Sequence, residues 1–451
     1  MLEGQKQCIA VVGCGHVGLV TAAGLAALGH AVTGIDTDRS RVALLQQSEV
    51  PFAEPQLENL VFEMAAAGRL RFTANYRDGL TGASMVFLCV STPAAVAGAA
   101  DLSYVRAAVA TLASVLVTSE RQPVIVNKST SPIGTGETID GLLRRAFAAG
   151  GATPPTIASN PEFLREGQAV HDFFHPSRIV AGAADPAVAR TVAALYRGIR
   201  APVVITDLRT AEMIKYVSNA YLATRVSFAN EVARLCEALE VESETVLLGA
   251  GMDPRIGSAF FRPGVGYGGS CLPKDVSALC HVADSLGIPL RLLNSVQHVN
   301  TQQKKHVVNS LRQLLHGLEG RTIAVWGLTF KSGTDDLRDS PAVEVVALLR
   351  NEGAIVRCYD PAVPQVGERI AEVTLLQSAE EACRGAQAIC ILTDWPQFRE
   401  VDLKRARLYM AGDVLYDGWN VVERRAAERA GFRYGGIGHP LPAETAQEIP
   451  A

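Results

Sequence analysis

The sequence has little excess charge of either sign, no closely paired cysteines and no long apolar run. Its 42 lysines and arginines nearly balance 46 aspartates and glutamates, so no strongly basic surface indicates a nucleic acid partner. The nine cysteines are scattered, without a C-x-x-C pair or a cluster with histidine at metal-ligand spacing. This pattern argues against a structural metal site and is typical of a reducing, cytoplasmic compartment.

Apolar runs such as 18–28 are too short and too rich in glycine to cross a bilayer, so we expect no membrane segment. The few residues before the first predicted strand leave no room for a signal peptide. A chain of 451 residues is long for one domain, and two or three domains are expected.

Short apolar runs alternate with helical patterns over residues 8–205. This alternation predicts a doubly wound, mostly parallel sheet. The predicted strands are Cys8–Val12, Ala31–Asp36, Met85–Val90, Val124–Lys128, Thr156–Ser159 and Ile179–Ala181.

The segment 206–251 has helical periodicity and no strand signal. Polar residues spaced three or four apart predict one face of a long helix there: Glu212, Lys215, Tyr216 and Asn219. A second βαβ pattern then begins, with strands predicted over Thr322–Gly327, Ala354–Tyr359, Ala388–Thr393 and Val414–Tyr416 and a helix over Ser340–Glu352.

The predicted fold class is therefore α/β, with two Rossmann-like domains joined by a central helical dimerisation region. The predicted domains are 1–205 for the dinucleotide, 206–316 for the central region and 317–451 for the second Rossmann-like domain. The tail 443–451 is predicted to be disordered.

The run Gly13-Cys14-Gly15-His16-Val17-Gly18 stands between a predicted strand and a predicted helix. Its first glycine would form the tight turn, the second would let a pyrophosphate approach the backbone, and the third would let the helix pack closely on the strand. Asp36 ends the second strand at the spacing of a ribose-binding acid, which favours NAD over NADP. FAD proteins share this fingerprint and remain an alternative, and Arg41 is either an adenosine contact or a solvated helix residue.

Two further segments place side chains of possible function near strand ends. Thr92 and Thr130 follow predicted strands at the sheet edge where such folds bind ligands, although capping and turn formation would also explain them. Glu162 and Glu166 would share a face if their segment were helical, which suits general base work or the positioning of water. The alternative is a solvated helix start.

Lys215 and Asn219 are four residues apart on an otherwise apolar helical pattern. An ammonium and a carboxamide on one face would stabilise a developing oxyanion. The alternative interpretation is a surface pair whose polar ends reach the solvent. Cys271 follows a glycine-rich tract, 264–269, and precedes Lys274 and Asp275. A cation and a helix N-terminus would favour the thiolate and a nucleophilic role, while the other eight cysteines are predicted to be inert core residues.

These segments together resemble the UDP-glucose/GDP-mannose dehydrogenases, and most closely the members that oxidise UDP-glucose. The resemblance covers nearly the whole chain. It rests on the motifs GCGHVG, VSTP, NKSTSPIGT, SNPEFLREG, AEMIKYVSNAYLATRVSFANEVARLCE, DPRIG, GVGYGGSCLPKD and WGLTFKSGTDDLRDSPA.

The resemblance implies a four-electron oxidation of the C6 alcohol of a nucleotide sugar to a uronic acid, with two NAD⁺ used in turn. Cys271 would form a thiohemiacetal and then a thioester. Lys215 and Asn219 would stabilise oxyanions. The resemblance further implies that Asp275, Thr130 and Glu166 hold or activate water. Glu162 would line the substrate site.

The resemblance also assigns binding residues. The cofactor contacts would be Gly13, Gly15, His16, Val17, Gly18, Asp36, Arg41, Thr92, Thr130, Glu166, Lys274 and Arg338. The substrate contacts would be Phe163, Leu164, Arg165, Glu166, Lys215, Asn219, Arg255, Phe260, Phe261, Arg262, Pro263, Gly264, Gly268, Phe330 and Lys331. Arg255 would reach the neighbouring subunit's site, which implies a homodimer.

One position departs from the family pattern. Trp419 stands where many members carry an arginine, so UDP-N-acetylmannosamine and GDP-mannose stay open as substrates beside UDP-glucose. Two other classes are a non-catalytic nucleotide-sugar-binding protein and a dehydrogenase that stops after one hydride transfer. The intact set of Cys271, Lys215, Asn219 and Asp275 argues against both.

Overall fold

Two sheets organise the chain, and each belongs to its own compact unit. The computed structural model describes residues 6–95, 98–364 and 373–441. The first unit comprises Met1–Ser218 and Ser277–Ile288, and the second comprises Asn219–Val276 and Pro289–Ala451. The tail predicted to be disordered, 443–451, lies outside the described residues. Within the described part of the chain, no helix is long and apolar enough to cross a membrane.

The sheet of the first unit has the strand order β3-β2-β1-β4-β5-β6-β7-β8. Only β6 and β7 pair antiparallel among its described neighbours. The order reverses between β1 and β4, where ligands of doubly wound sheets bind beyond the carboxyl ends. The strands are β1 (Cys8–Val12), β2 (Ala31–Ile35), β3 (Leu70–Thr73), β4 (Met85–Leu88), β5 (Val124–Asn127), β6 (Ile157–Ser159), β7 (Ile179–Ala183) and β8 (Val203–Thr206).

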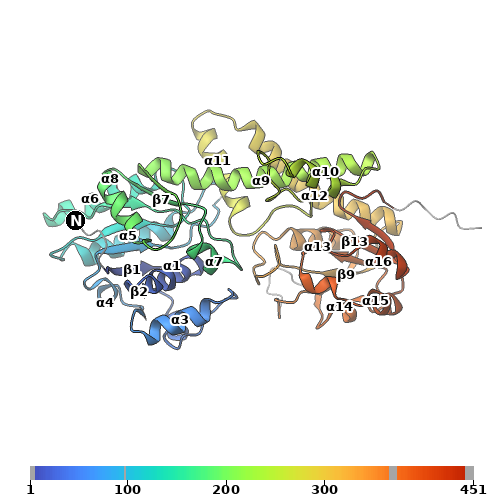
Figure 1. The fold of residues 1–451 in the computed structure, drawn as a ribbon, viewed down its shortest axis with the longest axis horizontal. Helices are drawn as coiled ribbons and strands as arrows, with labels where there is room; N and C mark the ends of the chain where they lie inside the picture. The colour runs from blue at the N-terminus through green and yellow to red at the C-terminus, as the bar shows by residue number, and fades with distance from the viewer. Residues whose placement is uncertain (1–5, 96–97, 365–372, 442–451) are drawn as a thin grey trace, which may run out of the picture. The chain divides into compact units, whose positions relative to one another are not determined.

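Helices cover both faces of this sheet because its buried strands are apolar on both sides (Figure 1). In β1, Ile9 and Val11 enter one core while Ala10 and Val12 enter the other. The first core is completed by α1 (His16–Ala27), α3 (Leu57–Ala66), α7 (Ala169–Phe174) and α8 (Pro186–Ala194), and the second by α4 (Tyr76–Leu80), α5 (Ser103–Leu116) and α6 (Thr135–Gly150). A short helix, α2 (Arg39–Gln46), follows β2.

The predicted central helical segment is confirmed. It forms the 31-residue helix α9 (Leu208–Ala238) and then α10 (Ser243–Gly251), and α9 is continuous in Figure 1. The polar face predicted for it is buried, with exposed fractions of 1–6% for Glu212, Lys215, Tyr216 and Asn219. The helices α11 (Leu272–Ser285) and α12 (Arg291–Leu315) follow.

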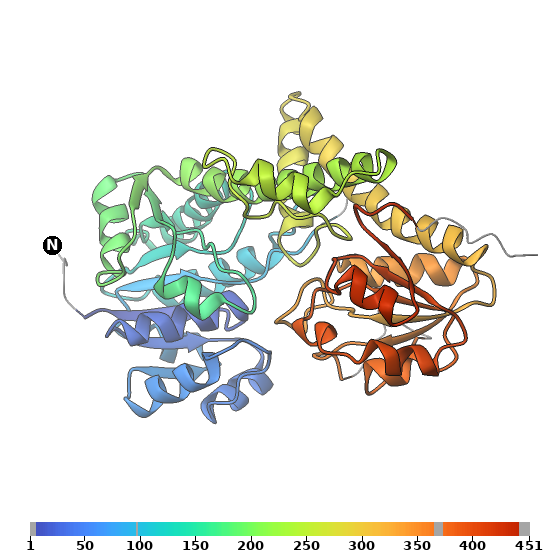
Figure 2. The ribbon, with the colours of Figure 1, turned by 45° about the vertical axis from the view of Figure 1, so that its right-hand side comes forward.

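The sheet of the second unit is parallel and has the order β11-β10-β9-β12-β13-β14. Helices α12 and α13 (Pro341–Asn351) pack on one face. The other is covered by α14 (Ala379–Cys383), α15 (Leu403–Tyr409) and α16 (Arg424–Arg429), and Figure 2 shows these layers from a second side. The strands are β9 (Thr322–Trp326), β10 (Ile355–Tyr359), β11 (Thr374–Leu375), β12 (Ala388–Ile391), β13 (Val414–Asp417) and β14 (Arg433–Gly436), and a 3₁₀ turn, η3, spans Pro396–Arg399.

Candidate active site

The predicted glycine turn joins β1 to α1 and has the shape of a dinucleotide cradle. Gly13 has φ +92°, and a Cβ there would lie 2.7 Å from the carbonyl oxygen of Cys89. A Cβ on Gly18 would lie 1.7 Å from the Gly13 carbonyl oxygen, whereas one on Gly15 would meet nothing within 4 Å. The first and third glycines are therefore required by packing, and the second leaves its backbone open to a ligand. These residues fit NAD.

Asp36 lies one residue beyond β2 and is 7% exposed. Its carboxylate accepts hydrogen bonds from the Cys14 amide at 2.8 Å and the Asp38 amide at 2.9 Å, and Arg41 Nη1 donates to it at 3.1 Å. A carboxylate has acceptor positions beyond these three, so Asp36 retains capacity for ribose hydroxyls. Arg41 is thus engaged with the predicted ribose acid.

The equivalent acid of the second unit is Asp360, which directly follows β10. It receives donors from the Thr329 amide and hydroxyl, the Trp395 indole and two further backbone amides, and it is 4% exposed. Asp360 is therefore saturated by the protein itself, in contrast to Asp36. The second Rossmann-like unit therefore offers a poorer ribose-binding acid than the first.

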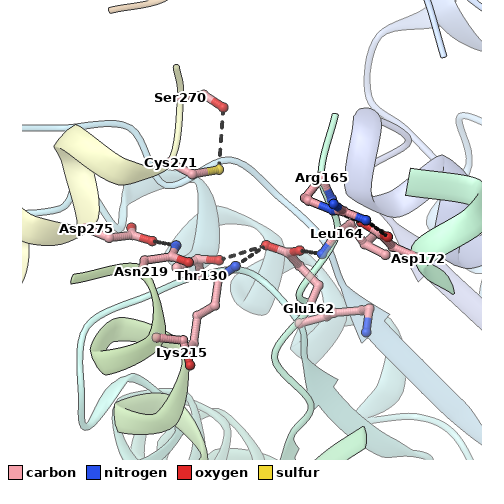
Figure 3. Close-up of polar contacts among 12 residues, drawn as sticks. Thr130, Glu162, Leu164, Arg165, Asp172, Lys215, Asn219, Ser270, Cys271 and Asp275 are labelled. Atoms are coloured by element: carbon pink, nitrogen blue, oxygen red, sulfur yellow. Dashed lines mark hydrogen bonds and ion pairs between the residues drawn. The ribbon is translucent and has the colours of Figure 1, made fainter. Parts of the chain in front are cut away.

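Several predicted residues of the first unit converge at the carboxyl edge of its sheet (Figure 3). Thr92 Oγ1 donates to the Thr130 carbonyl at 2.6 Å, and Thr130 Oγ1 lies 3.5 Å from Glu162 Oε1. Lys215 Nζ pairs with the same Glu162 oxygen at 2.8 Å, and the Leu164 amide donates to the other. Burial raises the pKa of the Glu162 carboxyl, but the charge and hydrogen bond of Lys215 outweigh it, so the pKa lies below its ordinary value.

Lys128 is a functional candidate that the sequence reasoning missed. It is 4% exposed, and its ammonium donates to Asn160 Oδ1 at 3.0 Å and the Tyr196 hydroxyl at 3.2 Å. Its charge also helps to lower the pKa of Glu162. The available signal was a lysine that directly follows the apolar strand β5.

The conditional prediction of a helix carrying both Glu162 and Glu166 is wrong. The segment 160–165 is non-helical, a turn covers 166–167, and α7 begins only at Ala169. Carboxylates take the amides that a helix would need: Glu162 accepts from Leu164, and Asp172 accepts from Arg165 at 3.0 Å. The two acids consequently differ in burial, with Glu162 buried and Glu166 half-buried.

Cys271 lies directly before the first residue of α11 and is the one half-buried cysteine among the described residues. Ser270 Oγ is 3.6 Å from its sulfur. Partial exposure at a helix N-terminus favours a reactive thiolate. By contrast, burial raises the thiol pKa of Cys14, Cys89 and Cys358, as expected for inert core residues. The prediction that all eight other cysteines lie in the core is wrong for Cys8, which is exposed at the first position of β1.

Asn219 and Asp275 are brought together in the second unit. Asn219 Nδ2 donates to Asp275 Oδ2 at 2.6 Å (Figure 3). Lys274 Nζ pairs with Asp275 Oδ1 at 2.6 Å. Asp275 is 0% exposed, so this buried carboxylate is held by one cation and one carboxamide. Asn219 lies one turn after Lys215 on α9, as the spacing predicted.

Three buried carboxamides that the sequence reasoning missed hold the glycine tract before Cys271. Asn230 accepts from the Gly264 amide at 2.8 Å, and Gln303 donates to the Gly264 carbonyl at 2.9 Å. Asn300 bonds both the amide and the carbonyl of Tyr267, at 2.8 and 3.0 Å. Their signal was a polar residue on an otherwise apolar helix face.

The same tract packs against the loops that follow β9 and β13. A Cβ on Gly269 would lie 2.6 Å from the Phe330 ring, and one on Gly264 would lie 2.4 Å from the Trp419 ring. The Trp419 indole donates to the Leu392 carbonyl at 2.9 Å, so this departure from the family pattern is a packing residue here. Arg262 donates to the Trp419 carbonyl and places a guanidinium beside it.

Two arginines predicted to contact the substrate and the cofactor lie on the surface. Arg255 and Arg338 are exposed, and each pairs with an aspartate two residues earlier, Asp253 and Asp336. The described residues contain no group of three His, Cys, Asp or Glu side chains able to hold a metal ion.

Comparisons place these features among known proteins. The chain matches the UDP-glucose/GDP-mannose dehydrogenase family models for the NAD binding domain over residues 7–200, the central domain over 209–302 and the UDP binding domain over 324–424. It is 40% identical over 432 residues to the Bacillus subtilis (strain 168) UDP-glucose 6-dehydrogenase YwqF, covering 95% of this chain and 97% of that protein. A UDP-glucose 6-dehydrogenase of Pseudomonas aeruginosa is 41% identical over 444 residues, covering 96% and 97%.

Two solved structures of dehydrogenases have a similar fold. A UDP-glucose dehydrogenase from Pyrobaculum islandicum superposes with a TM-score of 0.88 at 38% identity, covering 96% of this chain and 98% of that one. A UDP-D-ManNAc dehydrogenase from Pyrococcus horikoshii gives 0.85 at 29% identity, covering 96% and 99%.

Proposed function

The chain belongs to the UDP-glucose/GDP-mannose dehydrogenase family, and we infer that it is an NAD-dependent UDP-glucose 6-dehydrogenase. It oxidises the C6 alcohol of UDP-glucose to the carboxylate of UDP-glucuronate. Relatives named for this activity match at about 40% identity over nearly the full chain. The observation that carries the chemistry is the half-buried Cys271 at the N-terminus of α11, after a glycine tract held by buried carboxamides.

The first oxidation removes a proton and a hydride from the C6 alcohol and leaves an aldehyde. We propose that Lys215 and Asn219 stabilise the developing oxyanion through an ammonium and a carboxamide. Asp275, Thr130 and Glu166 hold or activate water. When bound, NAD⁺ accepts the hydride of each oxidation and leaves as NADH.

The second oxidation needs a covalent adduct. The Cys271 thiolate adds to the aldehyde carbon, and the resulting thiohemiacetal becomes a thioester by losing the hydride of that carbon to NAD⁺ and the proton of its hydroxyl to water. Water then breaks the carbon–sulfur bond, releasing the carboxylate and returning the thiol. Glu162 is the acid that lines the substrate site and forms an ion pair with Lys215.

The binding residues stay as proposed from the family resemblance. NAD is held by the Gly13–Gly18 turn, Asp36 and Arg41, with the further cofactor contacts Thr92, Lys274 and Arg338. We propose the three-part division at 1–205, 206–316 and 317–451, which the two sheets and the three matched family models support. Nine free cysteines support a cytoplasmic location.

A substrate panel tests this function. Purified protein with NAD⁺ is given UDP-glucose, UDP-N-acetylmannosamine or GDP-mannose, and NADH absorbance and the acid product are measured. Two NADH per UDP-glucose are expected. One NADH per sugar would indicate a single-step dehydrogenase, and turnover only with another sugar would overturn the substrate assignment.

Cys271→Ser tests the covalent step. We expect uronic acid formation to fall by at least about 10³-fold while the sugar nucleotide still binds, because a serine hydroxyl is a far weaker nucleophile at neutral pH. Cys280→Ser is the matched control, since Cys280 lies on α11, the helix that follows Cys271, but is buried. Acid formation by Cys271→Ser at the wild-type rate would refute the thioester.

We also propose a homodimer. One face of α9, together with Leu239 directly after its last residue, exposes large apolar side chains with exposed fractions of 44–63%; those on the helix are Met213, Val217, Tyr221, Phe228 and Leu235. They recur at intervals of four or seven residues, so they form one stripe along the helix. A stripe of this length is typical of a surface covered by a second copy of the chain.

A further inference from the structure

A buried carboxylate of the first unit lies outside the set of residues that the resemblance assigns. The Glu54 side chain is fully buried and accepts three hydrogen bonds. They come from His16 Nε2 at 2.6 Å, the Gly167 amide at 2.7 Å and the Ala169 amide at 2.8 Å. Burying a charge is costly unless it is paired and hydrogen-bonded, so all three donors are needed to hold it there.

The donors come from two functional segments far apart in the sequence. His16 is the first residue of α1 and belongs to the glycine turn that fits NAD. Gly167 directly follows Glu166, and Ala169 lies two residues further on, in the segment that also carries Glu162. Glu54 therefore bridges the cofactor turn and the segment of the two acids with one side chain.

The bridge is rigid at both of its ends. The His16 ring stacks on Phe52, with centroids 4.8 Å apart and planes inclined by 19°. Gly167 has φ +78°, a conformation that favours glycine, and in this conformation its amide donates to Glu54. A displacement of His16 would break one bond of Glu54 and loosen the two others.

We propose that Glu54 is a positioning residue, which transmits occupation of the cofactor turn through His16 to the segment 160–169. This inference rests on the proposed function, in which Glu162 lines the substrate site and Glu166 holds or activates water. Two cofactors must bind and leave in each turnover, while the sugar remains bound to Cys271 between them. A link between the turn and the acids would order the acids each time a cofactor arrives.

Hydrogen exchange measures this transmission directly. NADH is added to the wild-type protein, and amide protection is followed in peptides covering 160–169. In parallel, NADH affinity and the kcat and KM with NAD⁺ and UDP-glucose are determined. The variants are His16→Phe, which keeps a ring to stack on Phe52 but cannot donate, and Glu54→Gln, which has one acceptor oxygen instead of two. Glu58→Gln is the control because Glu58 is exposed on the neighbouring helix α3.

We expect NADH to increase protection of 160–169 in the wild type and in Glu58→Gln. In His16→Phe the increase should be lost and kcat should fall about tenfold, although NADH affinity changes less than about threefold, because the turn binds phosphates through its backbone. If Glu54→Gln fails to fold, the His16→Phe variant alone still tests the positioning role of Glu54. NADH-induced protection and a wild-type kcat in His16→Phe would overturn the proposal. The exchange measurement needs no sugar, so failure of the wild type to oxidise UDP-glucose would be recognised separately.

Discussion

At the scale of single residues, the pair of Glu162 and Lys215 is the most sensitive part of the candidate site. Both side chains are nearly fully buried, at 4% and 5% exposure, and their charges lie 2.8 Å apart. Removing one partner of a buried pair leaves the other charge uncompensated, which typically costs about 3–5 kcal/mol. The pair therefore contributes to stability as well as to chemistry.

Lys215→Met should make stability depend on pH in a new way. With Lys215 present, the pKa of Glu162 is lowered, so its contribution is lost only as the pH falls through that folded-state value. Without Lys215, burial raises the folded pKa above the unfolded value, and stability should decrease as the pH rises from about 5 to 8. Thermal unfolding at both pH values measures the difference from wild type. Adding Glu162→Gln to the variant should remove the pH dependence, and its persistence would exclude Glu162 as the cause.

Residue identities were predictable where a motif carried them and not where a partner comes from elsewhere in the fold. Cys271 and the glycine turn are local patterns whose chemistry follows from neighbouring residues. Lys128 and Asn300 act through partners 32 and 33 residues away, at the Asn160 side chain and the Tyr267 backbone. No spacing rule on one helix or strand reveals such a partner.

At the scale of elements, the N-cap of α6 is a glycine, and a side chain of α9 accepts the hydrogen bonds of the first amides of α6. Gly134 occupies the N-cap with φ +93° and has no side chain to satisfy the first amides. Glu212 accepts from the amides of Gly134 at 2.6 Å and Gly136 at 2.7 Å. Burial raises the pKa of Glu212 to about 7, and the two amides only partly offset it.

Glu212→Gln should remove a pH-dependent loss of stability. The folded-state pKa of about 7 exceeds the ordinary value of 4.5, so the folded protein binds more protons between these values. Wild-type stability should therefore fall across that range, by up to about 3 kcal/mol, and level off above it. Chemical denaturation at pH 5 and pH 8 should show a smaller difference in the variant. Equal pH differences in both proteins would show that Glu212 does not titrate in this range.

The central strands of the two sheets were predictable from the sequence, whereas the edge strands were not. Every predicted strand is present, while β3, β8, β11 and β14 were not predicted, and these four are the edges of the two sheets. An edge strand has one neighbour and one partly exposed side, so its apolar pattern is short or broken. β14 ends in two glycines and β11 has two residues, and both depend on the adjacent strand for their pairing.

At the scale of the whole molecule, the exposed stripe of α9 predicts the oligomeric state. Tyr221→Glu with Leu235→Glu places two charges on it, at positions 60% and 59% exposed. We expect dimer dissociation to become at least about 100-fold easier, since each charge would be desolvated in the interface. Sedimentation equilibrium gives the dissociation constant, and Leu408→Glu is the control because Leu408 is 84% exposed on α15. A dimer as tight as wild type in the double variant would exclude the stripe as the interface.

Whether Arg255 completes the partner's site can be decided by mixing two inactive proteins. The Arg255 side chain is 88% exposed and forms an ion pair with Asp253, two residues earlier, so its guanidinium is accessible to a second subunit. Arg255→Ala and Cys271→Ser are each expected to lose at least about 10²-fold in activity as homodimers.

If Arg255 acts on the neighbouring subunit, a mixed dimer holds one complete site: Cys271 of the first variant with Arg255 of the second. Random re-association should then restore about a quarter of the wild-type activity per subunit, because half of the dimers are mixed and each has one working site of two. If Arg255 instead serves its own subunit, every site in the mixture lacks one group and activity stays at the homodimer level.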